Sequence, residues 1–150
     1  MVKNPPEGYA RVTPYLLYHD CDAAIEFLTG TLGFTEKLRM SGQDGKANHA
    51  ELELEGGLIM LGNPGEDYKS PNELGGRTEL TYIYVDDVDA HYERAKAGGA
   101  HIERELEDQF YGDRTYALHD PEGHAWSFAT HVREVSPEEM QAAMAGATAS

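Results

Sequence analysis

Two stretches of sequence decide the fold: Asp20-Cys-Asp-Ala-Ala-Ile-Glu-Phe-Leu-Thr-Gly-Thr-Leu-Gly-Phe34 and Tyr84-Val-Asp-Asp-Val-Asp-Ala90. Each has aspartates that can cap a helix, and an amphipathic segment and a terminating glycine follow, Gly33 in one case and Gly99 in the other. The helix starts lie 67 residues apart, from Asp20 to Asp87, and the glycines lie 66 residues apart. This offset predicts a duplicated unit, although two capped amphipathic helices can also resemble each other by chance.

The segments around the two helices follow the same order in both halves. Alternating patterns and short apolar runs predict strands at 11–18, 35–40, 49–54 and 58–61, and again at 79–85, 101–106, 113–119 and 125–130. We therefore predict an α+β fold of two βαβββ modules, residues 9–62 and 78–131, which form a curved, cup-shaped mixed sheet with helices outside. The Gly- and Pro-rich residues 63–77 form a linker. A capping box of Ser136 and Glu139 begins a C-terminal helix, residues 136–146.

The composition restricts the classes of partner. The chain has 150 residues, enough for one domain with a core, and a formal net charge of −15. Such a charge repels a phosphate backbone, so we expect no nucleic-acid partner, and no apolar run suggests a membrane span. The N-terminal residues lack the apolar segment of a signal peptide, and the single cysteine, Cys21, allows no internal disulfide. We therefore expect a cytoplasmic protein.

The two helix-start stretches and the turn Asp120-Pro-Glu-Gly-His124 resemble motifs of the glyoxalase/bleomycin resistance protein/dioxygenase superfamily, also called the vicinal oxygen chelate superfamily. The resemblance covers roughly residues 11–131 and depends on the order and spacing of motifs that are individually weak. It implies a small-molecule pocket inside the curved sheet, and a homodimer. A homodimer would also cover sheet edges that a single pair of modules leaves open.

Metal-using members of that superfamily hold their ion with side chains from the first and last strands of each module. Spacing from the motifs places the four corresponding positions at Thr13, Met60, Leu80 and Ser127. None of these side chains offers the imidazole or carboxylate that such a metal needs. The resemblance is therefore to a metal-free, bleomycin-resistance-like branch, and we expect no metal and no other cofactor.

Tyrosines are the main candidates for ligand contacts, because the chain has nine of them against four phenylalanines. Side chains two apart on a strand share a face, so Tyr82 and Tyr84 face the pocket if Leu80 does, and Tyr15 faces it if Thr13 does. These rings could stack on a planar ligand, or they could fill the core with their hydroxyls at its rim. The loop 109–114 is expected at the pocket mouth. The predicted ligand contacts are Tyr15, His49, Met60, Tyr82, Tyr84, Phe110, Tyr111 and Arg114.

His49, Glu51 and Glu53 alternate along one predicted strand and therefore share a face. Three interpretations stay open for this face: a solvated outer surface, a polar anchor for a ligand through His49, or a metal held by His49 and Glu51. The first is the commonest fate of such a pattern.

These observations favour a small-molecule binding protein that sequesters a drug or secondary metabolite without a metal. The alternative is a glyoxalase-like, metal-dependent lyase, isomerase or dioxygenase, or metal-free acid–base chemistry by His49 or Glu51. A purely structural role ranks third, since only the C-terminal helix suggests it.

Overall fold

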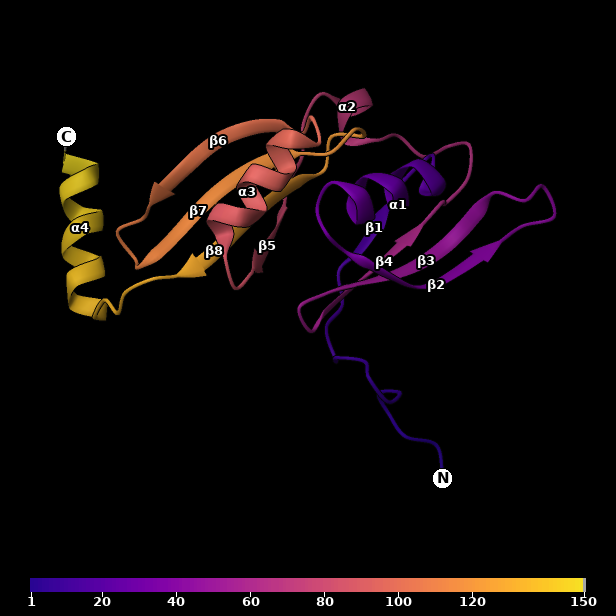
Figure 1. The fold of residues 1–150 in the computed structure, drawn as a ribbon, viewed down its shortest axis with the longest axis horizontal. Coiled ribbons are helices and arrows are strands. Elements are labelled where there is room, and N and C mark those ends of the chain that lie inside the picture. The colour runs from indigo at the N-terminus through magenta and orange to yellow at the C-terminus, as the bar shows by residue number, and fades with distance from the viewer. Residues whose placement is uncertain (150) are drawn as a thin grey trace.

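The computed structural model describes residues 1–149, which form two four-stranded mixed sheets with helices against them (Figure 1). Sheet one contains β1 (Tyr15–Leu17), β2 (Thr35–Ser41), β3 (Ala47–Leu54) and β4 (Gly57–Gly62), in the order β1-β4-β3-β2. Sheet two contains β5 (Leu80–Tyr84), β6 (His101–Asp108), β7 (Asp113–His119) and β8 (Ala125–His131), in the order β5-β8-β7-β6. In both sheets the first strand is parallel to the last and the other pairs are antiparallel, which confirms the predicted α+β fold.

The helices α1 (Cys21–Gly30) and α3 (Val88–Ala97) begin as the aspartate pattern predicts. Asp20 accepts a hydrogen bond from the Ala23 amide at 3.0 Å, and Asp87 accepts one from the Ala90 amide at 3.0 Å. Soon after each helix the chain turns at a glycine with positive φ, where other residues would be strained: Gly33 at 83° and Gly99 at 81°. The duplication is therefore visible in the backbone as well as in the sequence.

The apolar core lies between the helices and the inner faces of the two sheets. It is continuous across both modules, because Phe34 packs edge-on against Trp126 with ring centroids 5.8 Å apart. Tyr18 of module one also donates a hydrogen bond to the buried carboxylate of Asp120 in module two, at 2.6 Å. These contacts hold the two modules together within one chain.

Two connecting elements complete the fold. The linker contains a one-turn helix, α2 (Pro71–Leu74), which the sequence prediction missed although Ser70 and Glu73 form a capping box there. The C-terminal helix α4 (Pro137–Ala149) begins after the predicted cap, Ser136, whose hydroxyl accepts the Glu139 amide at 3.1 Å. Figure 1 shows α4 at the far end of module two, outside both sheets. Among the described residues, no helix combines the length and the apolar character needed to cross a membrane.

Candidate functional site

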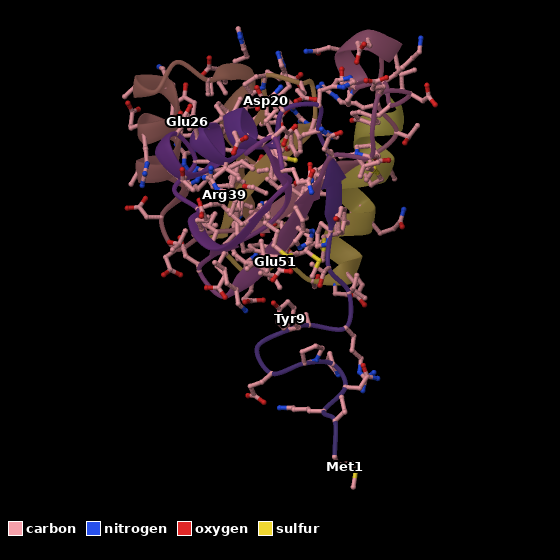
Figure 2. The ribbon with its side chains drawn as sticks, turned by 90° about the vertical axis from the view of Figure 1, so that its right-hand side faces the viewer. Met1, Tyr9, Asp20, Glu26, Arg39 and Glu51 are labelled. Carbon is pink, nitrogen blue, oxygen red and sulfur yellow. The ribbon has the colours of Figure 1, made fainter. Side chains whose placement is uncertain are left out.

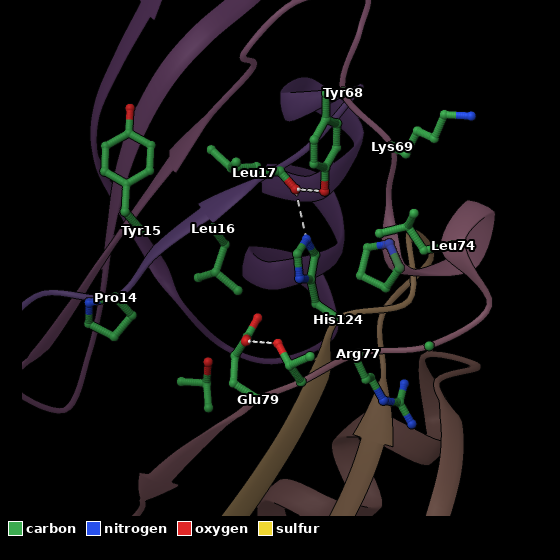
Figure 3. A pocket seen from close by; sticks show the side chains of 14 residues that line it. Pro14, Tyr15, Leu16, Leu17, Tyr68, Lys69, Leu74, Arg77, Glu79 and His124 are labelled. Carbon is green, nitrogen blue, oxygen red and sulfur yellow. Dashed lines mark hydrogen bonds between the residues drawn. The ribbon is translucent and has the colours of Figure 1, made fainter.

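A hollow lies where the edge strand of sheet one meets the edge strand of sheet two (Figure 3). Its volume is about 750 Å³, and the linker and the Asp-Pro turn close one side of it. Tyr68 from the linker and His124 from the turn both donate to the carbonyl oxygen of Leu17, each at 2.7 Å. The lining is mostly apolar, with a few charged groups, and consists of Pro14, Tyr15, Leu16, Leu17, Tyr68, Lys69, Pro71, Leu74, Gly76, Arg77, Thr78, Glu79, Thr81 and His124.

A second hollow of about 480 Å³ lies between β5 and the beginning of β4. It shares Pro14 and Thr81 with the first, and its walls include Tyr82 and Tyr84 of β5, part of the N-terminal arm (residues 8–12) and the turn between β3 and β4. We call the two hollows together the inter-sheet groove. Tyr15 lines its first part, and Tyr82 and Tyr84 line its second part.

The tyrosines of β5 lie on the face that the spacing predicts. Leu80, Tyr82 and Tyr84 are exposed on the side away from α3, whereas Ile83 packs against the core and Val85 is buried. The strand register pairs Tyr82 with Ser127, just as it pairs Tyr15 with Met60 in module one. The two modules thus present a tyrosine at equivalent positions. Met60 shares this row with Tyr15 but lines neither hollow.

In module one, Tyr15 is linked through a histidine to a buried carboxylate. The Tyr15 hydroxyl lies 2.8 Å from Nδ1 of His49, and Nε2 of His49 lies 2.9 Å from Oε2 of Glu51. The other oxygen of Glu51 accepts the hydroxyl of Tyr9, which reaches it from the N-terminal arm (Figure 2). Burial alone would raise the pKa of Glu51, but the hydrogen bonds from His49 and Tyr9 outweigh it and lower that pKa. Glu51 is therefore an ionised carboxylate that is only 5% exposed.

This finding decides one of the three interpretations left open for the His49–Glu51 face. The solvated outer surface is wrong for Glu51, because the arm and neighbouring side chains cover that side chain. Glu53 on the same face is exposed, as that interpretation expected. The alternation identified the face but could not show that Tyr9 would return to cover it.

In module two, Asp113 is the buried carboxylate that binds tyrosine and histidine side chains, as Glu51 does in module one. Its Oδ2 accepts the hydroxyls of Tyr82 at 2.6 Å and Tyr84 at 2.8 Å, and its Oδ1 lies 2.7 Å from Nδ1 of His131. Burial would raise the pKa of Asp113, but these three hydrogen bonds lower it overall. The pKa of Tyr82 is raised, first by burial and then by its bond to Asp113, and Tyr111 adds a further hydrogen bond that raises it. Sequence reasoning missed Asp113, although it opens a predicted strand.

The predicted mouth loop is only partly assembled around this cluster. Phe110 and Tyr111 pack edge to face, with ring centroids 5.3 Å apart, and Tyr111 reaches Tyr82. Arg114 does not join them: its guanidinium binds Asp89 of α3 at 2.8 Å and Asp108 at 3.1 Å. Adjacent positions on a strand point to opposite faces, so Asp113 and Arg114 cannot both face the ligand side.

The four positions where the superfamily would hold a metal do not fit one. Thr13 and Ser127 offer only hydroxyls, Met60 a thioether, and Leu80 an exposed aliphatic chain. Within residues 1–149, no group of three or more His, Cys, Asp and Glu side chains is placed to hold an ion. The side chains of His49 and Glu51 are hydrogen-bonded to each other. We therefore derive no chemical step through a metal.

The His131–Asp113 contact gives a testable dependence of stability on pH. The pKa of His131 is raised, chiefly by its hydrogen bond to Asp113. The stability that His131 contributes to the folded state is therefore complete below about pH 6.5, and it is lost as pH rises through the raised pKa. The pKa of Asp113 is lowered, so the stability that Asp113 contributes to the folded state is present above about pH 4 and is lost as pH falls through the lowered pKa. We expect His131→Gln to lower the midpoint of urea unfolding more at about pH 5.5 than at about pH 9. An equal shift at both pH values would contradict this.

Together, the duplicated βαβββ module and the groove between its first strands define the class of fold, two four-stranded mixed sheets with a hollow between their edge strands. Comparison with protein-family profiles matches residues 10–128 to the Glyoxalase/Bleomycin resistance protein/Dioxygenase superfamily. The chain belongs to this superfamily.

Individual relatives agree with this assignment. The uncharacterized protein Rv0887c of Mycobacterium tuberculosis is 39% identical over 138 residues, which cover 89% of this chain and 81% of the relative. The crystal structure of TioX from Micromonospora sp. ML1 is 35% identical, with a TM-score of 0.69, and the match covers 83% of this chain and 100% of TioX. The fosfomycin resistance protein FosX from Listeria monocytogenes, at 18% identity and a TM-score of 0.59 over 88% of this chain and 98% of FosX, shares the fold.

Proposed function

We propose that the protein binds a small, planar, partly apolar molecule in the inter-sheet groove, without a metal, and so sequesters a drug or secondary metabolite. The observation that carries the proposal is the hollow of about 750 Å³ between β1 and β5, which is within the size range of drug-sized ligand sites. Its apolar lining from Leu16, Leu17 and Leu74 would supply burial, and the exposed ring of Tyr15 stands at one side of it (Figure 3).

The tyrosines of module two would supply stacking in the second part of the groove. Tyr82 and Tyr84 hold their hydroxyls on Asp113, which fixes the rings while leaving them exposed. Rings fixed in this way lose little freedom when a planar ligand binds. The formal net charge of −15 would attract a cationic ligand over long range.

The binding test is a thermal-shift screen of planar, drug-like compounds, followed by calorimetry of the best binder with and without EDTA. We expect Tyr82→Ala to weaken the binding of that compound by about 1–2 kcal/mol, because stacking and burial are lost. EDTA should leave the affinity of the unaltered protein unchanged. Leu74→Asp, at the rim of the hollow, should also weaken binding, whereas Leu38→Asp, at an exposed position on the edge strand β2, is the matched control. The proposal fails if the screen yields no binder, or if Tyr82→Ala and Leu74→Asp bind as well as Leu38→Asp.

We also propose that the protein is a homodimer. Each sheet has an edge strand away from the groove, β2 in sheet one and β6 in sheet two, and open strand edges favour pairing or covering. Light scattering at micromolar concentration should therefore give twice the chain mass of 16.6 kDa. A mass equal to one chain would contradict the dimer and would leave the binding proposal standing.

A further inference from the structure

We propose that Tyr15, His49 and Glu51 form a proton-transfer relay, with the Tyr15 hydroxyl as the atom that meets the bound molecule. The relay would make the site capable of general acid–base chemistry on a weakly acidic O–H or C–H group of a small molecule. It depends on the proposed function for the location of that molecule: Tyr15 is among the residues that line the first hollow of the groove, and it is 51% exposed.

The hydrogen-bond directions in this chain of groups follow from the ionised carboxylate. Glu51 accepts from Tyr9 through Oε1, so Oε2 remains to accept a proton-bearing nitrogen, and Nε2 of His49 lies 2.9 Å from it. A neutral imidazole that donates from Nε2 has a lone pair on Nδ1. In this neutral form, Nδ1 lies 2.8 Å from the Tyr15 hydroxyl, which then donates to it. A hydroxyl that donates to an imidazole oriented by a carboxylate is the arrangement of an activated oxygen.

The position of the Tyr15 ring is also restricted by the backbone beneath it. The ring crosses Gly62 so closely that an added Cβ there would lie 2.6 Å from the Tyr15 hydroxyl oxygen and 2.7 Å from Cε1. Only a glycine allows this approach. His49 and Gly62 are register partners on β3 and β4, so the imidazole and the glycine together place the hydroxyl.

Tyr84 provides a natural contrast within the same protein. Its side chain is exposed to a similar degree, 57% for the residue against 51% for Tyr15, but its hydroxyl donates directly to the carboxylate of Asp113. That bond raises the pKa of Tyr84, and the lowered pKa of Asp113 makes this carboxylate a poor proton acceptor. The two tyrosines are therefore similarly exposed, but only Tyr15 has a partner, His49, that could accept its proton.

The proton transfer balances without any co-reactant. Tyr15 passes its hydroxyl proton to Nδ1 of His49 while its oxygen takes a proton from the bound molecule, which becomes its conjugate base. The imidazolium keeps its Nε2–H bond to Glu51, whose negative charge stabilises it. The reverse steps return the proton to the molecule.

The test uses N-acetylimidazole, which acetylates tyrosine hydroxyls, with mass spectrometry to follow each tyrosine separately. The C–N bond of the reagent breaks as a C–O bond forms to Tyr15, and the phenol proton passes through His49 to the departing imidazole. We expect Tyr15 to react about a hundredfold faster than Tyr84, the lower range of what a positioned base contributes. His49→Gln should bring Tyr15 to the rate of Tyr84, and Glu51→Gln should slow it partly.

Folding of each variant is checked by circular dichroism and thermal melting. If His49→Gln does not fold, Gly62→Ala serves instead, because its methyl group would displace the Tyr15 ring from His49 while the His49–Glu51 bond remains. Equal rates for Tyr15 and Tyr84 in the unaltered protein, or an unchanged Tyr15 rate in the folded variant, would overturn the relay. A fast Tyr15 without any groove ligand would refute the binding proposal alone, and a ligand without a fast Tyr15 would refute the relay alone.

Discussion

Replacing Asp120 with Ala is expected to lower the free energy of unfolding by about 3–5 kcal/mol, because it removes a buried charge that holds both modules. Asp120 is 1% exposed, and its Oδ2 accepts the hydroxyl of Tyr18 at 2.6 Å and Nε1 of Trp126 at 3.0 Å. Its Oδ1 accepts the backbone amides of Glu122 and His124 at 3.1 and 3.0 Å. One substitution would thus leave four donors without their acceptor.

Urea unfolding is the appropriate measurement, with Asp67→Ala as the control, since Asp67 is exposed on the linker. The control should change the free energy of unfolding by no more than about 0.5 kcal/mol. Asp120→Asn keeps one acceptor oxygen, so we expect a smaller loss, about 2 kcal/mol. A loss under about 1 kcal/mol for Asp120→Ala would show that the modules do not depend on this carboxylate.

Much of the fold follows from short-range patterns in the sequence. Asp20 and Asp87 each cap a helix by accepting an amide three residues later, and a glycine turns the chain soon after each helix. Because these signals are local, their spacing was enough to detect the duplication. The face of β5 was also predictable, because alternation along a strand is a local property. The first strand is shorter than the predicted 11–18: β1 begins at Tyr15, immediately after Pro14, which cannot donate to a ladder.

The candidate site was less predictable, because its chemistry depends on contacts between distant residues. Glu51 could be placed on a strand face, but its burial depends on Tyr9, 42 residues earlier in an arm without regular structure. Arg114 could be placed beside the predicted mouth, but its direction depends on Asp89 in a helix of the same module. Tyr68 and His124 close the hollow from a linker and a turn whose paths the sequence does not determine.

The last prediction compares the two faces of module two by their effect on stability. Phe128 is 0% exposed and packs on His91, Tyr116 and Trp126, with ring centroids 4.1, 5.6 and 6.4 Å apart. We expect Phe128→Ala to lower the free energy of unfolding by about 3–5 kcal/mol, the usual cost of an aromatic cavity in a core.

Tyr82 lies on the neighbouring strand but faces the groove, so Tyr82→Ala should cost only about 1 kcal/mol. Asp113 would keep Tyr84 and His131 as donors after that change, which limits the loss. Ile83→Ala should fall between the two, because Ile83 packs on the core but is only half-buried. Equal losses for Tyr82→Ala and Phe128→Ala in urea unfolding would mean that Tyr82 supports the fold. The groove would then lose one of its two module-two tyrosines as a stacking ring, and only Tyr84 would remain for that role.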